Sequence, residues 1–380
     1  MNIAILGYGT VGGGVHAILR DGNLDIHVKR VLDIRPVGGL AAGMLTDNIG
    51  DIIADPAIDC VVETIGGIHP ALTYVVAALR AGKHVVTSNK ELICKSLAPI
   101  LLGAQAHQAQ IRFSASVGGG IPWIHNLLRQ KRGDQILSVQ GIVNGTTNFI
   151  LDAMQYGSSF EDALTSARTL GYAEADVSDD LHGIDTQRKC AISASLAFDA
   201  LIEATNIPTL GIAAVSSRDI GAFAEKGLTC RLMMMAERSG QNVCAYVEPM
   251  LLTRDSLAAH TPANYNCITL CAEHAGRLSF VGQGAGRFPT AENIVQDLLD
   301  ISVHESGVTV ESDKAMMVDN TLEAHAYYVR ATYLSPLQGM LSAPLRDGFL
   351  TRPMCVSAMH ALAKEIRERD AGAFFAGIPL

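Results

Sequence analysis

The stretch Asn2–Gly12, NIAILGYGTVG, decides the fold of this chain. It begins with an apolar run, Asn2–Leu6, typical of a buried parallel strand, and the pattern Gly-x-Gly-x-x-Gly follows directly. We expect a helix over Val11–Arg20 and a second strand over His27–Asp33. A strand, a glycine turn, a helix and a strand within about thirty residues indicate a dinucleotide-binding site. The alternative is a glycine-rich turn in another kind of α/β domain.

Each glycine of the pattern has a predicted purpose. Gly7 permits the tight turn, Gly9 lets the backbone approach a pyrophosphate, and Gly12 lets the helix pack on the strand. Thr10 lies at the start of the helix, where free N–H groups face the phosphate charge. We therefore predict that these four residues bind the cofactor.

The residues at the end of the second strand bear on the choice of cofactor. Asp33 lies where a carboxylate accepts hydrogen bonds from the ribose 2′-OH of NAD. Arg35 follows two residues later and suits the 2′-phosphate of NADP. Asp33 slightly favours NAD, and the sequence leaves both NAD and NADP open.

Regular alternation of strands and helices continues beyond this unit. Strands are expected at Cys60–Thr64, His84–Thr87 and Ile111–Ser116, and helices at Pro70–Ala81 and Lys90–Gln110. The spacing predicts an α/β fold with a doubly wound parallel sheet, which binds ligands beyond the carboxyl ends of its strands. Ser88 and Lys90 fall at such an end. Lys90 is either a partner for an anion or substrate, or an ordinary surface lysine beside a turn.

A second stretch, Gly171–Lys189 (GYAEADVSDDLHGIDTQRK), concentrates acidic residues before a lysine. Leu181–Phe198 is predicted to be a helix, with Asp179 or Asp180 as its N-cap. The carboxylates then lie at the positive end of the helix dipole.

In such a helix, Asp185 and Lys189 lie one turn apart on the same face. Glu174, in the loop that leads to the helix, can fold over that face. A lysine held among carboxylates can pass a proton to an oxygen that develops negative charge. The alternative is an ordinary exposed ion pair, worth roughly 0.3–0.5 kcal/mol.

Composition limits the classes of protein that fit. With 380 residues, 48% of them hydrophobic and 18% charged, the chain suits a globular protein of two or three domains. A net charge of −9 without a dense basic run excludes a nucleic-acid-binding face, and no apolar run is long enough to span a membrane. The N-terminus lacks signal-peptide features, and the eight cysteines are scattered, so we expect a cytoplasmic protein. The twelve histidines show no metal-ligand spacing, so metal catalysis is not expected.

Two further stretches are rich in glycine. Phe113–Pro122 (FSASVGGGIP) is expected to be a strand that runs into a triple glycine. Gly141–Asn148 (GIVNGTTN) is expected to be a strand that ends in an Asn-Gly turn, followed by a helix over Phe149–Tyr156. Taken singly, either stretch could be only a turn.

Together these motifs resemble the homoserine dehydrogenases. The resemblance covers Met1–Ile301, and the motifs are GYGTVG, VVETIGGI, GKHVVTSNK, SVGGGIP, GIVNGTTNFIL, GYAEADVSDDLHGIDTQRK and GQGAGRFPTA, in that order. It implies an oxidoreductase that uses NAD(P) to interconvert L-homoserine and L-aspartate 4-semialdehyde, on the route to threonine and methionine. A homodimer or higher homo-oligomer, formed through the middle domain, is also implied.

The resemblance implies a function for individual residues. Lys189 matches the lysine that gives and takes the proton at the substrate oxygen. Asp185 and Glu174 match carboxylates that bind homoserine, and Asp180 is a further candidate for this binding. Lys90 matches the lysine at the junction of nicotinamide and substrate, so it is a catalytic candidate with Lys189 and Asp185. Further positions implied to contact the cofactor are Val11, Ile65, Ser88, Lys90, Gly171 and Gly286.

One departure from the family concerns a monovalent cation. Family members commonly bind it through backbone carbonyls, which match Val117, Gly119 and Ile121, and through one glutamate. The glutamate position is Ser114 in this chain. A hydroxyl brings no negative charge, so we expect a weak or absent cation site and little activation by sodium or potassium.

We expect four parts in the chain. Residues 1–128 form the NAD(P)-binding domain, to which the chain returns at about 282–301, and residues 129–281 form the catalytic and dimerisation domain. Residues 302–321 are a linker, and 322–380 form a small module that resembles a reduced ACT-type regulatory domain. In this module we expect a strand over His325–Thr332 and a helix over Cys355–Arg369. An extra layer packed on the core is the alternative.

Two other functions compete with this interpretation. An aspartate-semialdehyde dehydrogenase needs an activated cysteine nucleophile with a histidine base, and no cysteine here lies in such a motif. A non-catalytic sensor of a dinucleotide and an amino acid does not need Lys189 beside its carboxylates. Both are therefore less well supported than the dehydrogenase.

Overall fold

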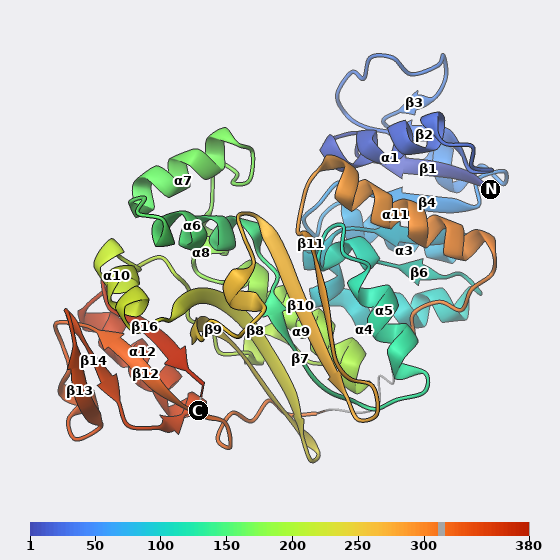
Figure 1. Ribbon diagram of the computed structural model, residues 1–380. Coiled ribbons are helices and arrows are strands. Elements are labelled where there is room, and N and C mark those ends of the chain that lie inside the picture. The colour runs from blue at the N-terminus through green and yellow to red at the C-terminus, as the bar shows by residue number, and fades with distance from the viewer. Residues whose placement is uncertain (311–315, 380) are drawn as a thin grey trace. The chain divides into compact units, whose positions relative to one another are not determined.

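The computed structural model describes residues 1–310 and 316–379, and the chain divides into two compact units (Figure 1). The first unit comprises residues 1–132, 199–201 and the described part of 283–314. The second comprises residues 133–198, 202–282 and the described part of 315–380. No helix among the described residues combines the length and the apolar character needed to cross a membrane.

A parallel six-stranded sheet forms the centre of the first unit, in the order β3-β2-β1-β4-β5-β6. The strands are β1 (Asn2–Leu6), β2 (His27–Leu32), β3 (Leu45–Thr46), β4 (Cys60–Glu63), β5 (His84–Thr87) and β6 (Ile111–Arg112). This is the order of dinucleotide-binding folds, in which the ligand lies beyond the carboxyl ends of the strands, where the order reverses between β1 and β4. The predicted doubly wound sheet is confirmed.

Six helices accompany this sheet in the described part of the first unit. They are α1 (Thr10–Asp21), α2 (Gly50–Ile53), α3 (Ala71–Arg80), α4 (Lys90–Ala106), α5 (Trp123–Lys131) and α11 (Arg287–Ser302). Of these, α1, α3, α4 and α11 pack on its strands. Helix α11 lies beside α1 (Figure 1), and its Ile294 and Leu298 share a buried core with Ile3 and Val15. A helix from far along the chain therefore completes the core around β1.

Helix α4 differs from the helix predicted over Lys90–Gln110. It ends at Ala106 and is kinked at Ser96, three residues before Pro99. A proline ring clashes with the carbonyl four residues before it and donates no hydrogen bond, which explains the kink.

The strand predicted over Ile111–Ser116 is wrong after Arg112. A 3-10 turn, η1 (Ser114–Ser116), follows in place of the strand, so the stretch Phe113–Pro122 does not begin as a strand either. The backbone N–H and the hydroxyl of Ser114 both donate to a carboxylate of α11, which draws the chain out of the sheet.

A mixed sheet of ten strands forms the second unit, in the order β11-β10-β7-β8-β9-β16-β12-β14-β13, with β15 beside β12 only. The strands are β7 (Ile136–Ile142), β8 (Thr229–Ser239), β9 (Asn242–Leu252), β10 (Tyr265–Ala272), β11 (Gly276–Gln283), β12 (Ala324–Arg330), β13 (Leu341–Leu345), β14 (Gly348–Thr351), β15 (Met354–Cys355) and β16 (Phe374–Ile378). The helices are α6 (Gly145–Gln155), α7 (Phe160–Thr169), α8 (Ser178–Leu181), α9 (Ile184–Phe198), α10 (Ser217–Glu225) and α12 (Val356–Arg369), with 3-10 turns η2 (Ala204–Asn206), η3 (Ala258–His260) and η4 (Ser335–Leu337). Helix α9 packs across β7, β8 and β9 and is almost entirely buried.

The last part of the sheet has an arrangement of its own. Strands β16, β12, β14 and β13 are neighbours in that order, and each pair is antiparallel. The chain passes through β12, η4, β13, β14, the two-residue strand β15, α12 and β16. This is the split βαββαβ order with a single 3-10 turn in place of the first helix. The predicted strand His325–Thr332 and helix Cys355–Arg369 correspond to β12 and α12.

Candidate active site

The helix predicted over Leu181–Phe198 corresponds to α9, which begins later, at Ile184, and a separate short helix, α8, ends at Leu181. They are separated at Gly183, which has a left-handed φ of 80° and lies against Thr209. Asp179 and Asp180 therefore lie inside the short α8, and the prediction that one of them caps the long helix is wrong.

Lys189 and Asp185 form a buried ion pair on α9. The Lys189 Nζ lies 2.7 Å from the Asp185 Oδ2, at the predicted spacing of one turn. The ammonium also donates to the carbonyl of Val143, which follows β7, at 2.7 Å. Only 10% and 3% of the two side chains are exposed, so an ordinary exposed ion pair is excluded.

Asn144 connects this pair to a second carboxylate. Its Nδ2 donates to Asp185 Oδ2 at 2.8 Å and to Asp180 Oδ1 at 2.6 Å. Its Oδ1 accepts from the Thr147 N–H at 2.8 Å and so caps α6, which begins at Gly145. The predicted Asn-Gly turn and the helix start at residue 149 are therefore wrong. The available signal was Asn144 itself, because asparagine is a favoured N-cap residue.

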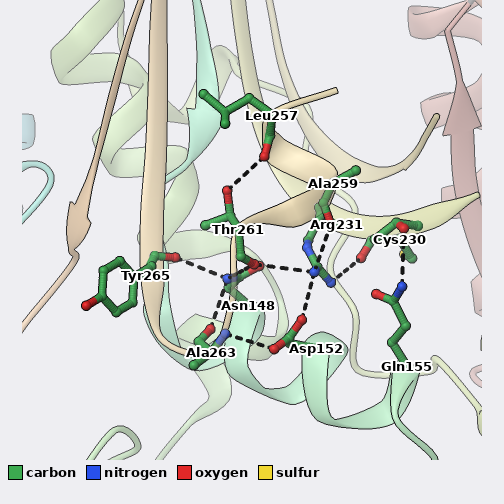
Figure 2. A network of polar contacts seen from close by, with 11 residues as sticks. Asn148, Asp152, Gln155, Cys230, Arg231, Leu257, Ala259, Thr261, Ala263 and Tyr265 are labelled. Carbon is green, nitrogen blue, oxygen red and sulfur yellow. Dashed lines mark hydrogen bonds and ion pairs between the residues drawn. The ribbon is translucent and has the colours of Figure 1, made fainter. Parts of the chain in front are cut away.

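A polar network holds α6 in place (Figure 2). Asn148 donates from Nδ2 to the carbonyls of Thr261, Ala263 and Tyr265, at 2.9–3.1 Å. The buried Arg231 of β8 donates to Asp152 of α6 at 2.9 Å and to three backbone carbonyls, those of Cys230, Ala259 and Thr261. The segment before β10 is thereby fixed against α6, the helix that Asn144 caps.

Glu174 is not joined to the ion pair. It is exposed in the loop between α7 and α8, and within the described chain no hydrogen bond or ion pair links it to Asp185 or Lys189. The loop is nevertheless anchored, because the Thr146 hydroxyl donates to the Tyr172 carbonyl at 2.6 Å. Gly171 lies one residue before this anchor, with a left-handed φ of 74°.

In the first unit, the glycine turn has the predicted geometry. Gly7 has a φ of 86°, and a side chain at Gly12 would overlap the Gly7 carbonyl. Gly9 precedes α1, and among the described residues no side chain caps this helix. The N–H groups at Thr10 and Val11 are thus presented at the carboxyl edge of the sheet, as an anion-binding helix start requires.

Asp33, which suits NAD, and Arg35, which suits NADP, form an ion pair with each other. The buried Asp33 carboxylate accepts from the Arg35 guanidinium at 3.1 Å through both Nε and Nη2. It also accepts the backbone N–H groups of Arg35 at 2.9 Å and Tyr8 at 2.8 Å. The guanidinium, together with these N–H groups, holds the pKa of Asp33 well below its usual range.

A buried glutamate organises the loops after β4 and β5. Glu63 Oε1 accepts from the N–H groups of Ile65 and Gly66 at 2.8 and 3.1 Å, and Oε2 accepts from the Thr87 hydroxyl at 2.5 Å. A carboxylate at the end of the otherwise apolar strand Cys60–Glu63 is the signal in the sequence for this site.

Asn89 completes the connection between these loops. Its Nδ2 donates to the Gly67 carbonyl at 2.5 Å, and its Oδ1 accepts the Leu92 N–H at 3.0 Å, which caps α4. Lys90 opens α4 as predicted, and it is half-buried beside Ser88. Ile65 and Ser88, on the loops after β4 and β5, and Lys90, at the start of α4, therefore lie at one edge of the sheet, where Glu63 and Asn89 connect the two loops.

Comparison with known proteins agrees with both halves of this geometry. Residues 7–114 match the family model described as the NAD binding domain of homoserine dehydrogenase, and residues 122–299 match the homoserine dehydrogenase model itself. The homoserine dehydrogenase of Corynebacterium glutamicum is 40% identical over 316 residues, which is 79% of this chain and 71% of the relative. The chain belongs to the homoserine dehydrogenase family.

Other homoserine dehydrogenases extend the match. That of Synechocystis is 34% identical over 358 residues, covering 90% of this chain and 81% of the relative. The crystal structure of a homoserine dehydrogenase from Thiobacillus denitrificans aligns over 100% of this chain and 98% of that chain, with a TM-score of 0.86 and 30% identity. The resemblance inferred from the motifs is confirmed, and the chain is a homoserine dehydrogenase, an oxidoreductase with an NAD-binding domain.

Proposed function

We propose that Lys189 is the acid–base residue for the interconversion of L-homoserine and L-aspartate 4-semialdehyde. The observation that supports this is its buried Nζ, held at 2.7 Å from both the Asp185 carboxylate and the Val143 carbonyl. Two acceptors favour the ammonium form, which suits donation of a proton to the aldehyde oxygen during reduction. In the opposite direction the amine takes the hydroxyl proton, directly or through water.

The carboxylates around Lys189 would bind the substrate. Asp185 and Asp180, both bound by Asn144, are suited to the ammonium and hydroxyl groups of homoserine, and they supply orientation. We assign the same purpose to Glu174, which lies two residues from the anchored Tyr172 carbonyl.

The nicotinamide cofactor would supply or accept the hydride. We propose that Gly7, Gly9, Thr10, Val11 and Gly12 bind its pyrophosphate. Further contacts would come from Ile65, Ser88, Lys90, Gly171 and Gly286, and Lys90 would also contribute to catalysis. The support is the position of Gly7–Gly12, Ile65, Ser88 and Lys90 at the carboxyl edge of the first unit's sheet.

The paired Asp33 and Arg35 would allow both NAD and NADP to bind. Arg35 is 68% exposed at its side chain, so it can leave Asp33 and bind a 2′-phosphate. When NAD binds, the Asp33 carboxylate can accept the 2′-OH instead.

The remaining family expectations stand as proposals. The protein would be a cytoplasmic homodimer or higher homo-oligomer with an NAD(P)-binding domain at 1–128 and 282–301, a catalytic domain at 129–281, a linker at 302–321 and an ACT-like module at 322–380. The split βαββαβ order of the last strands supports the module. None of the eight cysteines, all of which lie in the described part of the chain, forms a disulfide, as suits a reducing compartment.

Homoserine-dependent reduction of NAD and NADP tests the main proposal. Lys189→Ala should reduce turnover by ~10²–10⁴-fold, the usual contribution of a positioned acid or base. Lys131→Ala is a matched control, because Lys131 also pairs with an aspartate, Asp199, at 2.6 Å. A Lys189→Ala variant that binds homoserine and keeps most of its turnover would transfer the acid–base function to Lys90.

The same assay tests the cofactor residues. Arg35→Ala should raise the KM for NADP about tenfold or more, because a charged hydrogen bond to phosphate is lost. The KM for NAD should stay nearly unchanged. Asp33→Ala should instead weaken the binding of NAD and raise the KM for NAD. An unchanged NAD/NADP ratio in both variants would remove this pair from cofactor selection.

A further inference from the structure

Helix α11 presents one polar side chain per turn to the segment that follows β6. Asp300 accepts from the Arg112 guanidinium at 2.8 Å, one turn beyond Asp297. Asp297 accepts from the Ser114 N–H at 2.8 Å and from the Ser114 hydroxyl at 2.7 Å. Asn293 lies one turn earlier on the same face, since residues three or four apart are neighbours on a helix. The three side chains form a ladder that fixes the segment 112–121.

Asn293 binds the triple-glycine turn at the end of this segment. Its Nδ2 donates to the Gly119 carbonyl at 2.8 Å and to the Ile121 carbonyl at 3.0 Å. Asn293 is 2% exposed, so this nitrogen fills a buried point on which two carbonyl oxygens converge. Gly119 has a left-handed φ of 59°, and a side chain there would overlap the Gly284 carbonyl, so the turn cannot easily rearrange.

The monovalent cation implied by the family does not fit these residues. Two of its three carbonyl positions, Gly119 and Ile121, already accept hydrogen bonds from one amide. Its glutamate is replaced by Ser114, whose hydroxyl is bound to Asp297. Buried carbonyls need a positive partner, and an amide N–H group meets this need without a net charge. The chain lacks both the negative charge of the glutamate and the positive charge of the cation, so the net charge of the site is unchanged.

We propose that the Asn293 side-chain amide permanently occupies the place of the cation. The turn is then held by the chain itself, and neither folding nor turnover depends on sodium or potassium. Asn293 acts as a positioning residue for the triple-glycine turn.

Thermal unfolding in sodium, potassium or choline chloride at equal ionic strength tests this proposal. The wild type should unfold at the same temperature in all three salts. In Asn293→Ala the two carbonyls lose their donor, so sodium or potassium should raise the unfolding temperature relative to choline, on the order of 2–4 °C at saturation. Gln296→Ala is the matched control, because this amide is exposed on α11 and donates to Glu292 of the same helix.

A second variant, Asn293→Asp, keeps the shape of the side chain and turns an oxygen toward the carbonyls. It should require sodium or potassium for stability, and it decides the question if Asn293→Ala does not fold. A wild type stabilised by sodium or potassium over choline would overturn the proposal, as would Asn293→Asp that shows no difference among the salts.

Homoserine turnover in the same salts provides a second readout, which rests on the proposed function. Wild-type turnover should be equal in choline and in potassium, and several-fold activation at millimolar potassium would overturn the proposal. The unfolding temperature reports on the triple-glycine turn even if the protein does not turn over homoserine. Inactivity with homoserine, combined with the expected unfolding temperatures, would therefore count against the proposed function alone.

Discussion

Individual asparagines carry much of the geometry around the candidate site. Asn144 binds two carboxylates and caps a helix, and Asn148 and Asn293 each gather backbone carbonyls around one amide nitrogen. A carboxamide both donates and accepts, so a single buried side chain can satisfy groups from several segments. Asn144 determines where the carboxylate partner of Lys189 lies, because it donates to the same Asp185 oxygen that pairs with the ammonium.

Substitution of Asn144 tests this dependence. Asn144→Ala should raise KM for homoserine and lower turnover ~10-fold or more, because Asp180 and Asp185 lose a shared donor. It should also destabilise α6 by about 1 kcal/mol through the lost cap. Asn144→Asp retains the cap and places a third carboxylate beside two others. If the cap alone matters, Asn144→Asp will match the wild type in steady-state kinetics, and the positioning function is refuted.

At the scale of elements, the stability that the ladder on α11 contributes depends on pH. Burial raises the pKa of Asp297 to about 6. The folded state therefore holds this proton more tightly than the unfolded state, whose value is near 3.8. The contribution of Asp297 to the free energy of unfolding is therefore complete below pH 4. As the pH rises to about 6 this contribution is lost, and the loss amounts to at most ~3 kcal/mol.

Asp297→Asn should flatten this part of the stability curve. The amide keeps an acceptor for the Ser114 N–H and a donor for its hydroxyl, and it has no proton to lose. Urea unfolding at pH 4.5, 5.5 and 7 should show the variant gaining stability relative to wild type as pH rises. If the free energies of unfolding of the two proteins changed with pH in parallel, Asp297 would have the same pKa in the folded and unfolded states.

Elements formed by local sequence were predictable, and those set by distant partners were not. The first two strands and the glycine turn follow from apolar runs and glycine spacing within Asn2–Asp33. The strand predicted after Arg112 failed because its fate depends on Asp297, which lies far along the chain. Similarly, the pair of Asp185 and Lys189 followed from helical spacing, whereas Asn144 binds Asp185 from about forty residues earlier in the chain.

At the scale of the whole molecule, the C-terminal strands belong to the sheet of the second unit. Strand β16 pairs with β9, and a side chain at Gly377 would overlap the carboxylate of Glu248. Glu248 is fully buried and binds His360 of α12 at 2.9 Å. The buried carboxylate therefore connects the strands of residues 324–378 to β9.

Gly377→Ala should destabilise the protein by roughly 1–3 kcal/mol, the usual cost of an added group in a packed interior. Gly372→Ala is the matched control, since the nearest atom to its added methyl group lies 3.4 Å away. Chemical denaturation of both variants provides the measurement. Equal stabilities would show that β9 and β16 move apart easily.

The position of α11 in the chain has a consequence for synthesis on the ribosome. Residues 1–132 contain the whole parallel sheet, but Ile294 and Leu298 complete the core around β1, and Asn293 and Asp297 hold the segment after β6. A nascent chain must therefore expose this apolar surface until about residue 302 has left the exit tunnel. The nucleotide-binding sheet is therefore synthesised first but its core is completed late, after segments 133–198 and 202–282 of the second unit have been made.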